Sequence, residues 1–121
     1  QALRTHLEET KGHVSKVENL LRQNVGDAEA ETCKVMNGLS TEASDTLKDV
    51  KDTSVRDIAL IAAAQQVEHH EIAVYGTLRR WAELIGRQQD AGILKSIEAE
   101  EVHADKLLTE ISGRVNLEAA A

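Results

Sequence analysis

Apolar residues recur every three or four positions along three long stretches of this chain, which is the spacing of one face of an α-helix. The stretches run over about residues 2–24, 54–85 and 88–112. The stripe of the first consists of Leu3, His6, Leu7, Thr10, His13, Val14, Val17, Leu20 and Leu21. That of the third consists of Leu94, Ile97, Glu101, Ala104, Leu108 and Ile111. The pattern predicts three long helices, and two of the stripes include charged or titratable residues.

Glycines follow each of these stretches, at Gly26, Gly86 and Gly113. Glycine is the usual residue just beyond a helix C-terminus, so we expect the helices to end there. The segment between the first two contains a short amphipathic pattern, which predicts a connecting helix over about 33–48. Few residues separate the last two helices, which makes them antiparallel neighbours. The longer connection after the first helix has the length to cross the bundle from end to end.

Composition supports an all-α fold. Of the 121 residues 41% are hydrophobic and only 2% aromatic, and proline is absent. Ala, Leu, Glu, Lys, Gln and Arg dominate, and they are good helix formers. A chain of this length is expected to form one domain, residues 1–121. The core must therefore be built mainly from aliphatic side chains, and we expect Tyr75 and Trp81 to be packing residues within it.

The charge of the chain narrows the range of partners. A formal net charge of −7 disfavours nucleic acids and anionic membranes, which require clustered Lys and Arg. No apolar run has the length of a membrane span, and no signal-peptide pattern opens the chain. The single cysteine, Cys33, excludes an internal disulfide and is expected to be a small core residue. These features favour a cytoplasmic location.

The segment Glu68-His69-His70-Glu71 lies in the middle of an apolar run. An isolated buried charge costs several kcal/mol unless it is paired, protonated or bound to a metal. Titratable residues also mark the inner faces of the other helices: His6, Glu9 and His13 in the first, and Glu101 and Asp105 in the third. Imidazole and carboxylate without thiolate suit iron, manganese or zinc. Helix bundles build di-iron and di-manganese centres from such residues.

Simpler interpretations apply to several of these side chains. Glu9 has the alternative of a solvated residue, because glutamate is rarely buried. His13 and His103 are expected at the surface or hydrogen-bonded in the core, and the Glu100–His103 pair is expected to face sideways. Glu68 and Glu101 are the strongest candidates because apolar neighbours flank both at helical spacing. Their structural alternative is a hydrogen-bonded polar layer that fixes helix register.

The segment from Glu68 to Leu78, EHHEIAVYGTL, closely resembles a Glu-His-Tyr-Glu-Ile-Ala-x-Tyr-Gly-Thr-Leu motif of the YciE/YciF-like ferritin-like proteins. Other segments agree with that family in the same order: His6–Thr10, Cys33–Leu39 with Glu42, Glu100–Glu101 with Asp105, and Asn116. The resemblance covers essentially the whole chain. It implies a ferritin-like bundle of bacterial origin that is associated with stress responses and has a di-metal site.

The chain departs from the family pattern in two respects, its first helix and its local ligand set. It has no counterpart of the family's first long helix, which carries a carboxylate. It begins at Gln1 rather than Met, so we expect a processed or trimmed N-terminus. His70 stands where tyrosine is usual, and His13 stands where glutamine is common. The ligand set is therefore expected to differ locally from that of its relatives.

The sequence thus predicts an all-α, ferritin-like antiparallel bundle of three long helices and a short connecting helix. The leading functional hypothesis is a metal-binding protein with a di-iron or di-manganese carboxylate site, with zinc as a third candidate ion. Its expected ligands are His6, Glu9, Glu68, Glu71, Glu101 and Asp105. Glu68 and Glu101 would be central or bridging, whereas Glu9, Glu71 and Asp105 would take outer positions. No catalytic residue is assigned.

Two functional classes remain open. A metal pair could react with dioxygen or peroxide, giving ferroxidase-like or peroxide-consuming oxidoreductase activity. The rival class is a structural or interaction bundle whose Glu/His layer sets assembly and no longer binds metal. In either class three amphipathic helices leave one apolar side uncovered, and monomers seldom expose patches beyond a few hundred Å². We therefore expect a homo-oligomer, at least a dimer, in which a partner chain completes the bundle.

Overall fold

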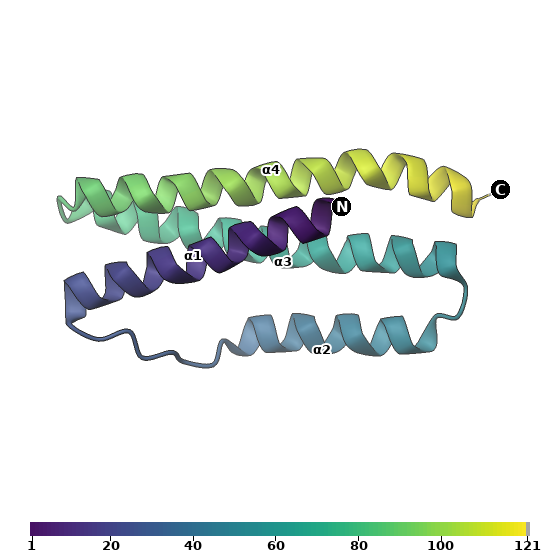
Figure 1. The fold of residues 1–121 in the computed structure, drawn as a ribbon, viewed down its shortest axis with the longest axis horizontal. Coiled ribbons are helices and arrows are strands. Elements are labelled where there is room, and N and C mark those ends of the chain that lie inside the picture. The colour runs from purple at the N-terminus through teal and green to yellow at the C-terminus, as the bar shows by residue number, and fades with distance from the viewer. Residues whose placement is uncertain (121) are drawn as a thin grey trace.

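A computed structural model describes residues 1–120 of the chain as four helices. These are α1 (Ala2–Val25), α2 (Lys34–Asp49), α3 (Thr53–Leu84) and α4 (Gln88–Ala119). No strand occurs among the described residues. The two longest helices, α3 and α4, run antiparallel and side by side along most of the molecule (Figure 1). The predicted all-α bundle of three long helices and one shorter helix is confirmed.

The other two helices each pack on one member of the α3–α4 pair. Backbone contacts join α1 to α4 and α2 to α3, and no comparable approach joins α1 to α2 or to α3 within the described chain. In Figure 1, α1 runs in the same direction as α3, while α2 carries the chain back toward the other end of the molecule. The connection after the first helix thus crosses the bundle, as its length predicted.

Two helix ends follow the glycine signals in the sequence. Gly26 and Gly86 both have φ of 79°, the left-handed region that glycine adopts without a steric penalty. Beyond α3, the Arg87 N–H donates to the Ala82 carbonyl at 2.8 Å and the Gly86 N–H donates to the Glu83 carbonyl at 3.1 Å. This pair of bonds is the Schellman arrangement, which satisfies carbonyls at the end of a helix.

The expected end of the last helix at Gly113 is wrong. Helix α4 continues through this glycine to Ala119. The interior of a helix tolerates glycine at a cost of only about 1 kcal/mol relative to alanine. Gly113 does not adopt the left-handed φ that Gly26 and Gly86 have at the ends of α1 and α3. The presence of a glycine was therefore not sufficient to end the helix.

Two expectations about core residues are also wrong, and both concern faces that no other helix covers. Cys33 is exposed, and its Sγ accepts a hydrogen bond from the Met36 N–H at the start of α2. Trp81 is 60% exposed on α3. Because α2 packs on α3 alone, and α1 lies against α4, parts of these apolar faces stay open.

The buried core lies mainly between α3 and α4. Its apolar members are Leu20, Ile61, Ala82, Ala91, Leu94, Ile97, Ala104 and Leu108. Five of these eight come from α4, which confirms the apolar stripe predicted for that helix. Glu101 is as deeply buried as Ile97, one turn before it, with both fully inaccessible to solvent. Among the described helices, none combines the length and hydrophobicity of a membrane-crossing segment.

Candidate metal centre

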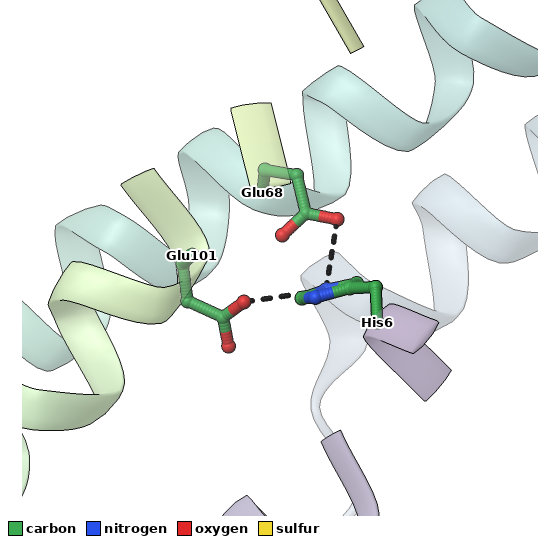
Figure 2. Close-up of side chains that lie close together, drawn as sticks. All are labelled: His6, Glu68 and Glu101. Atoms are coloured by element: carbon green, nitrogen blue, oxygen red, sulfur yellow. Dashed lines mark ion pairs between the residues drawn. The ribbon is translucent and has the colours of Figure 1, made fainter. Parts of the chain in front are cut away.

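Three side chains from three different helices meet inside the bundle: His6 of α1, Glu68 of α3 and Glu101 of α4 (Figure 2). The Nε2 atom of His6 lies 3.1 Å from Oε1 of Glu68 and 3.3 Å from Oε2 of Glu101. One potential ligand atom from each residue lies within 4.8 Å of the other two. The structure thus brings together the two carboxylates that the sequence singled out, with an imidazole between them.

Both carboxylates are buried without a full set of partners. Glu68 is 3% exposed and Glu101 is fully buried. Oε2 of Glu68 and both carboxylate oxygens of Glu101 have no hydrogen bond of good geometry. Buried polar atoms are nearly always hydrogen-bonded, and an unsatisfied one costs about 1–3 kcal/mol or more when charged. A bound cation would satisfy these oxygens, so the residues present fit a metal ion.

The ring of His6 is oriented by a second carboxylate. Its Nδ1 atom lies 3.1 Å from Oε2 of Glu9, one turn later on α1, while Nε2 faces Glu68 and Glu101. Metal-binding histidines commonly have this arrangement, in which an outer carboxylate holds one ring nitrogen and the other nitrogen faces the ion. The structure therefore places Glu9 behind His6 rather than beside the two buried carboxylates.

A second histidine lies on the opposite side of Glu101. His13 is 2% exposed, and its Nδ1 lies 2.9 Å from Oε1 of Glu101. Its Nε2 is 2.5 Å from Oε2 of Glu100, which also pairs with Nζ of Lys16 at 3.3 Å. Of the two positions expected for His13, the structure shows the core one. Glu100, which the sequence assigned to a sideways pair with His103, contacts α1 instead.

The charges of this cluster shift the titration of its members. The hydrogen bond with Glu68 raises the pKa of His6 to about 9, despite the opposing effect of burial. Burial and the negative charge of Glu71 raise the pKa of Glu101 well above its ordinary value. Burial and the charge of Glu68 likewise raise the pKa of Glu71. The centre therefore carries an excess of buried negative charge, which favours a proton or a cation.

The remaining expected ligands take different positions. Glu71 is half-buried and lines an open hollow of about 310 Å³ with His13 and Tyr75. Tyr75 also packs edge-on against His13, with ring centroids 6.3 Å apart, and burial raises its pKa to about 12. The carboxylate of Asp105 pairs with Nε2 of Gln65 at 3.1 Å and Nε2 of His69 at 3.2 Å. Asp105 thus belongs to a separate polar group between α3 and α4.

Three histidines lie outside the buried centre. His103 is exposed on α4, so of the two positions expected for it the structure shows the surface one. His69 is mostly exposed beside Asp105, and Nε2 of His70 lies 3.7 Å from Sγ of Cys33. These contacts join α2 and α4 to the outer side of α3. None of the three residues contributes to the group formed by His6, Glu68 and Glu101.

Long antiparallel helices, a crossover helix and a carboxylate–imidazole cluster in the core define a ferritin-like helical protein. The chain belongs to the family described as "Domain of unknown function (DUF892)", whose model matches residues 1–121. This family includes the YciF-type proteins that the sequence motif resembles, so the family prediction is confirmed.

Individual relatives agree in both sequence and structure. The chain is 40% identical over 113 residues to Protein YciF of Escherichia coli, covering 93% of this chain and 68% of YciF. The crystal structure of the E. coli stress protein YciF matches 95% of this chain and 73% of its own, with 39% identity and a TM-score of 0.88. YcfI of Rhodopseudomonas palustris matches with 36% identity and a TM-score of 0.86, over 90% and 69% of the two chains.

Proposed function

We propose that this chain is a ferritin-like metal-binding protein that holds iron or manganese in a two-metal carboxylate centre. The observation that carries the proposal is the meeting of His6, Glu68 and Glu101 from three helices, with buried carboxylate oxygens that lack hydrogen bonds. When bound, a pair of such ions supplies one-electron chemistry toward dioxygen or peroxide. That chemistry supports a role in a stress response, either as a ferroxidase or in peroxide consumption.

The side chains of the centre have separable tasks. Glu68 and Glu101 supply negative charge and oxygen ligands, and His6 supplies nitrogen. Glu9 holds the ring of His6 by its Nδ1 atom, so that Nε2 stays directed at the two carboxylates. Ile97 and Ala104, one turn before and one turn after Glu101, are buried and exclude water from its carboxylate. A small cavity of about 10 Å³ beside His6 and Glu68, near Ala104, adjoins the centre.

Metal analysis of the protein, prepared without chelator and then titrated anaerobically with Fe(II), tests the proposal. We expect bound metal in stoichiometric amounts, and oxidation of bound Fe(II) when dioxygen or peroxide is admitted. Absence of metal binding, even after Fe(II) addition, would favour the rival class, in which the Glu/His layer only sets helix register. Zinc bound in place of iron or manganese would retain the site but not the redox role.

We also propose that two copies of the chain pair through the apolar groove between α1 and α3. The single cysteine favours the reducing cytoplasm as the location of the protein. The groove has a volume of about 440 Å³, and its lining includes Leu21, Leu78 and Trp81. These side chains are 38%, 37% and 60% exposed, so a large apolar surface is open to solvent. A two-fold pair of chains, the commonest assembly symmetry, would bury this surface against itself.

Sedimentation analysis at micromolar concentration measures this pairing. Trp81→Glu is expected to convert a dimer to a folded monomer, because the new charge would be buried at the interface. Leu117→Glu is the matched control, since Leu117 is 76% exposed in the last turn of α4 and does not line the groove. A well-folded monomer of the unaltered chain, or a dimer that Trp81→Glu leaves intact, would refute this mode of pairing. If a segment of a longer protein covers the groove instead of a second copy, the unaltered chain is expected to be a well-folded monomer.

A further inference from the structure

The outer face of α4 is cationic, although the chain as a whole has a formal net charge of −7. Lys95, His103 and Lys106 are exposed, and their spacing places them on one side of the helix. With Arg79 of α3 they line an open hollow of about 670 Å³. Glu98, also in the lining, is bound to Arg79 at 2.6 Å. Within the described residues neither lysine forms an ion pair, so two positive charges on this face are uncompensated.

The outer face of α2 has the opposite charge. Glu42, Asp45 and Asp49 are exposed at three- and four-residue spacing and line an open hollow of about 480 Å³. Asp45 pairs with Lys48 at 3.1 Å. Glu42 and Asp49 form no ion pair within the described chain. Lys34 also lines the hollow, about two turns before Glu42. Two carboxylates on this face are therefore available to cations of another molecule.

The two faces match in direction and length. Helices α2 and α4 lie at opposite edges of the molecule and run in the same direction (Figure 1). Between Lys95 and Lys106, α4 rises about 16 Å. Between Glu42 and Asp49, α2 rises about 10 Å, which leaves a difference of about 3 Å at each end. The flexible four-carbon stem of a lysine can bridge such a difference, so both lysines can reach both carboxylates at once.

We propose that copies of this chain associate head to tail, with the cationic face of α4 in one copy seated on the acidic face of α2 in the next. Complementary charge sets the register of the two faces. A contact between two different surfaces generates an open chain of copies or a ring, rather than a two-fold pair. Neither face shares a residue with the apolar groove between α1 and α3, so this association is independent of pairing through the groove.

Sedimentation velocity of the full chain at about 20 mM salt measures the association. The average mass of the unaltered chain is expected to rise with protein concentration beyond that of a dimer. At about 500 mM salt it should return to that of a dimer or monomer, because salt screens exposed charges. The double variant Lys95→Glu with Lys106→Glu is expected to weaken the association at least about tenfold, because like charges would then face each other. Glu42→Lys with Asp49→Lys is expected to have the same effect.

Arg4→Glu with Lys51→Glu is the matched control. It changes the net charge of the chain as much as the α4 double variant does, but at exposed cations that line neither hollow. This control is expected to associate within a few fold of the unaltered chain. Far-UV circular dichroism checks that all the variants are folded.

An equimolar mixture of the two charge-reversed proteins gives the sharpest measurement. The reversed α4 face of one protein complements the reversed α2 face of the other, so the mixture is expected to associate although neither protein does so alone. Both proteins keep a net negative charge, so non-specific attraction does not explain this result. The proposal would be overturned by a mixture that does not associate, or by an unaltered chain that stays at or below a dimer at low salt. Association that persists at high salt or in either double variant would also overturn it.

Discussion

Replacing Glu101 by Gln is expected to lower the affinity of the chain for Fe(II) or Mn(II) by at least about 100-fold. Loss of an outer partner of a metal ligand commonly costs about 10–100-fold, and Glu101 is proposed to touch the ions directly. Glutamine keeps the size of the side chain but removes the negative charge that balances the cations. Isothermal titration calorimetry measures the affinity, and anaerobic Fe(II) mixed with dioxygen measures the accompanying loss of oxidation.

The metal-free Glu101→Gln variant is expected to unfold at a higher denaturant concentration than the unaltered chain at neutral pH and above. The buried charge of Glu101 is disfavoured by burial and by the neighbouring charges of Glu71 and Glu68. Glu110→Gln is the control, since this carboxylate is exposed on the same helix. Unchanged iron binding in both Glu101→Gln and Glu68→Gln would remove these residues from the ligand set.

The metal-free protein is expected to lose stability as the pH rises from about 6.5 to 9. The pKa of His6 is about 9 in the folded chain against 6.5 for an ordinary histidine, so the folded state holds an extra proton in this window. The stabilisation is complete below 6.5 and is lost as His6 deprotonates, and it amounts to at most about 3 kcal/mol. Glu101 acts in the same direction, because its pKa is raised on folding.

Bound metal is expected to oppose this loss. A metal ion requires deprotonated ligands, so its affinity rises as His6 and Glu101 lose their protons. Urea unfolding at several pH values, with and without Mn(II), should show that the ion stabilises the protein more at pH 8.5 than at pH 6.5. The metal-free His6→Gln variant should have a shallower pH dependence, whereas His103→Gln should keep that of the unaltered chain. If the free energy of unfolding of the metal-free chain stays constant or rises between pH 6.5 and 9, the raised pKa of His6 is contradicted.

The sequence was most informative about features that depend on one helix alone, such as buried polar residues and helix ends. Glu68 and Glu101 interrupt apolar stripes, and such an interruption is visible without knowledge of neighbouring helices. Gly26 and Gly86 mark helix ends because a left-handed residue is needed there. Gly113 shows the limit of this signal, since a single glycine in a helix interior costs only about 1 kcal/mol relative to alanine and α4 continues through it.

The contacts between side chains on different helices could not be predicted from the same patterns. His13 lies two turns after His6 in the apolar stripe, which was a signal for its burial. Its pairing with Glu100 depends on the angle at which α1 crosses α4, and periodicity does not contain that angle. Asp105 lies one turn after Glu101, yet the rotation of α4 against α3 brings it to Gln65 and His69. Metal occupancy stays a prediction for each of these residues.

The close backbone contacts of α1 are with α4 alone, so the proposed centre would fasten this helix to the bundle. The backbone of α1 approaches that of α4 only, whereas α3 and α4 contact each other along most of their length (Figure 1). Segments with few buried contacts open locally at a lower free energy than the rest of a protein. Because His6 resides on α1, opening of this helix would dismantle the proposed centre, and a bound ion would hold the helix closed. The affinity for the ion and the free energy of opening of α1 are then thermodynamically linked, so a substitution that weakens the α1–α4 interface is expected to weaken ion binding as well.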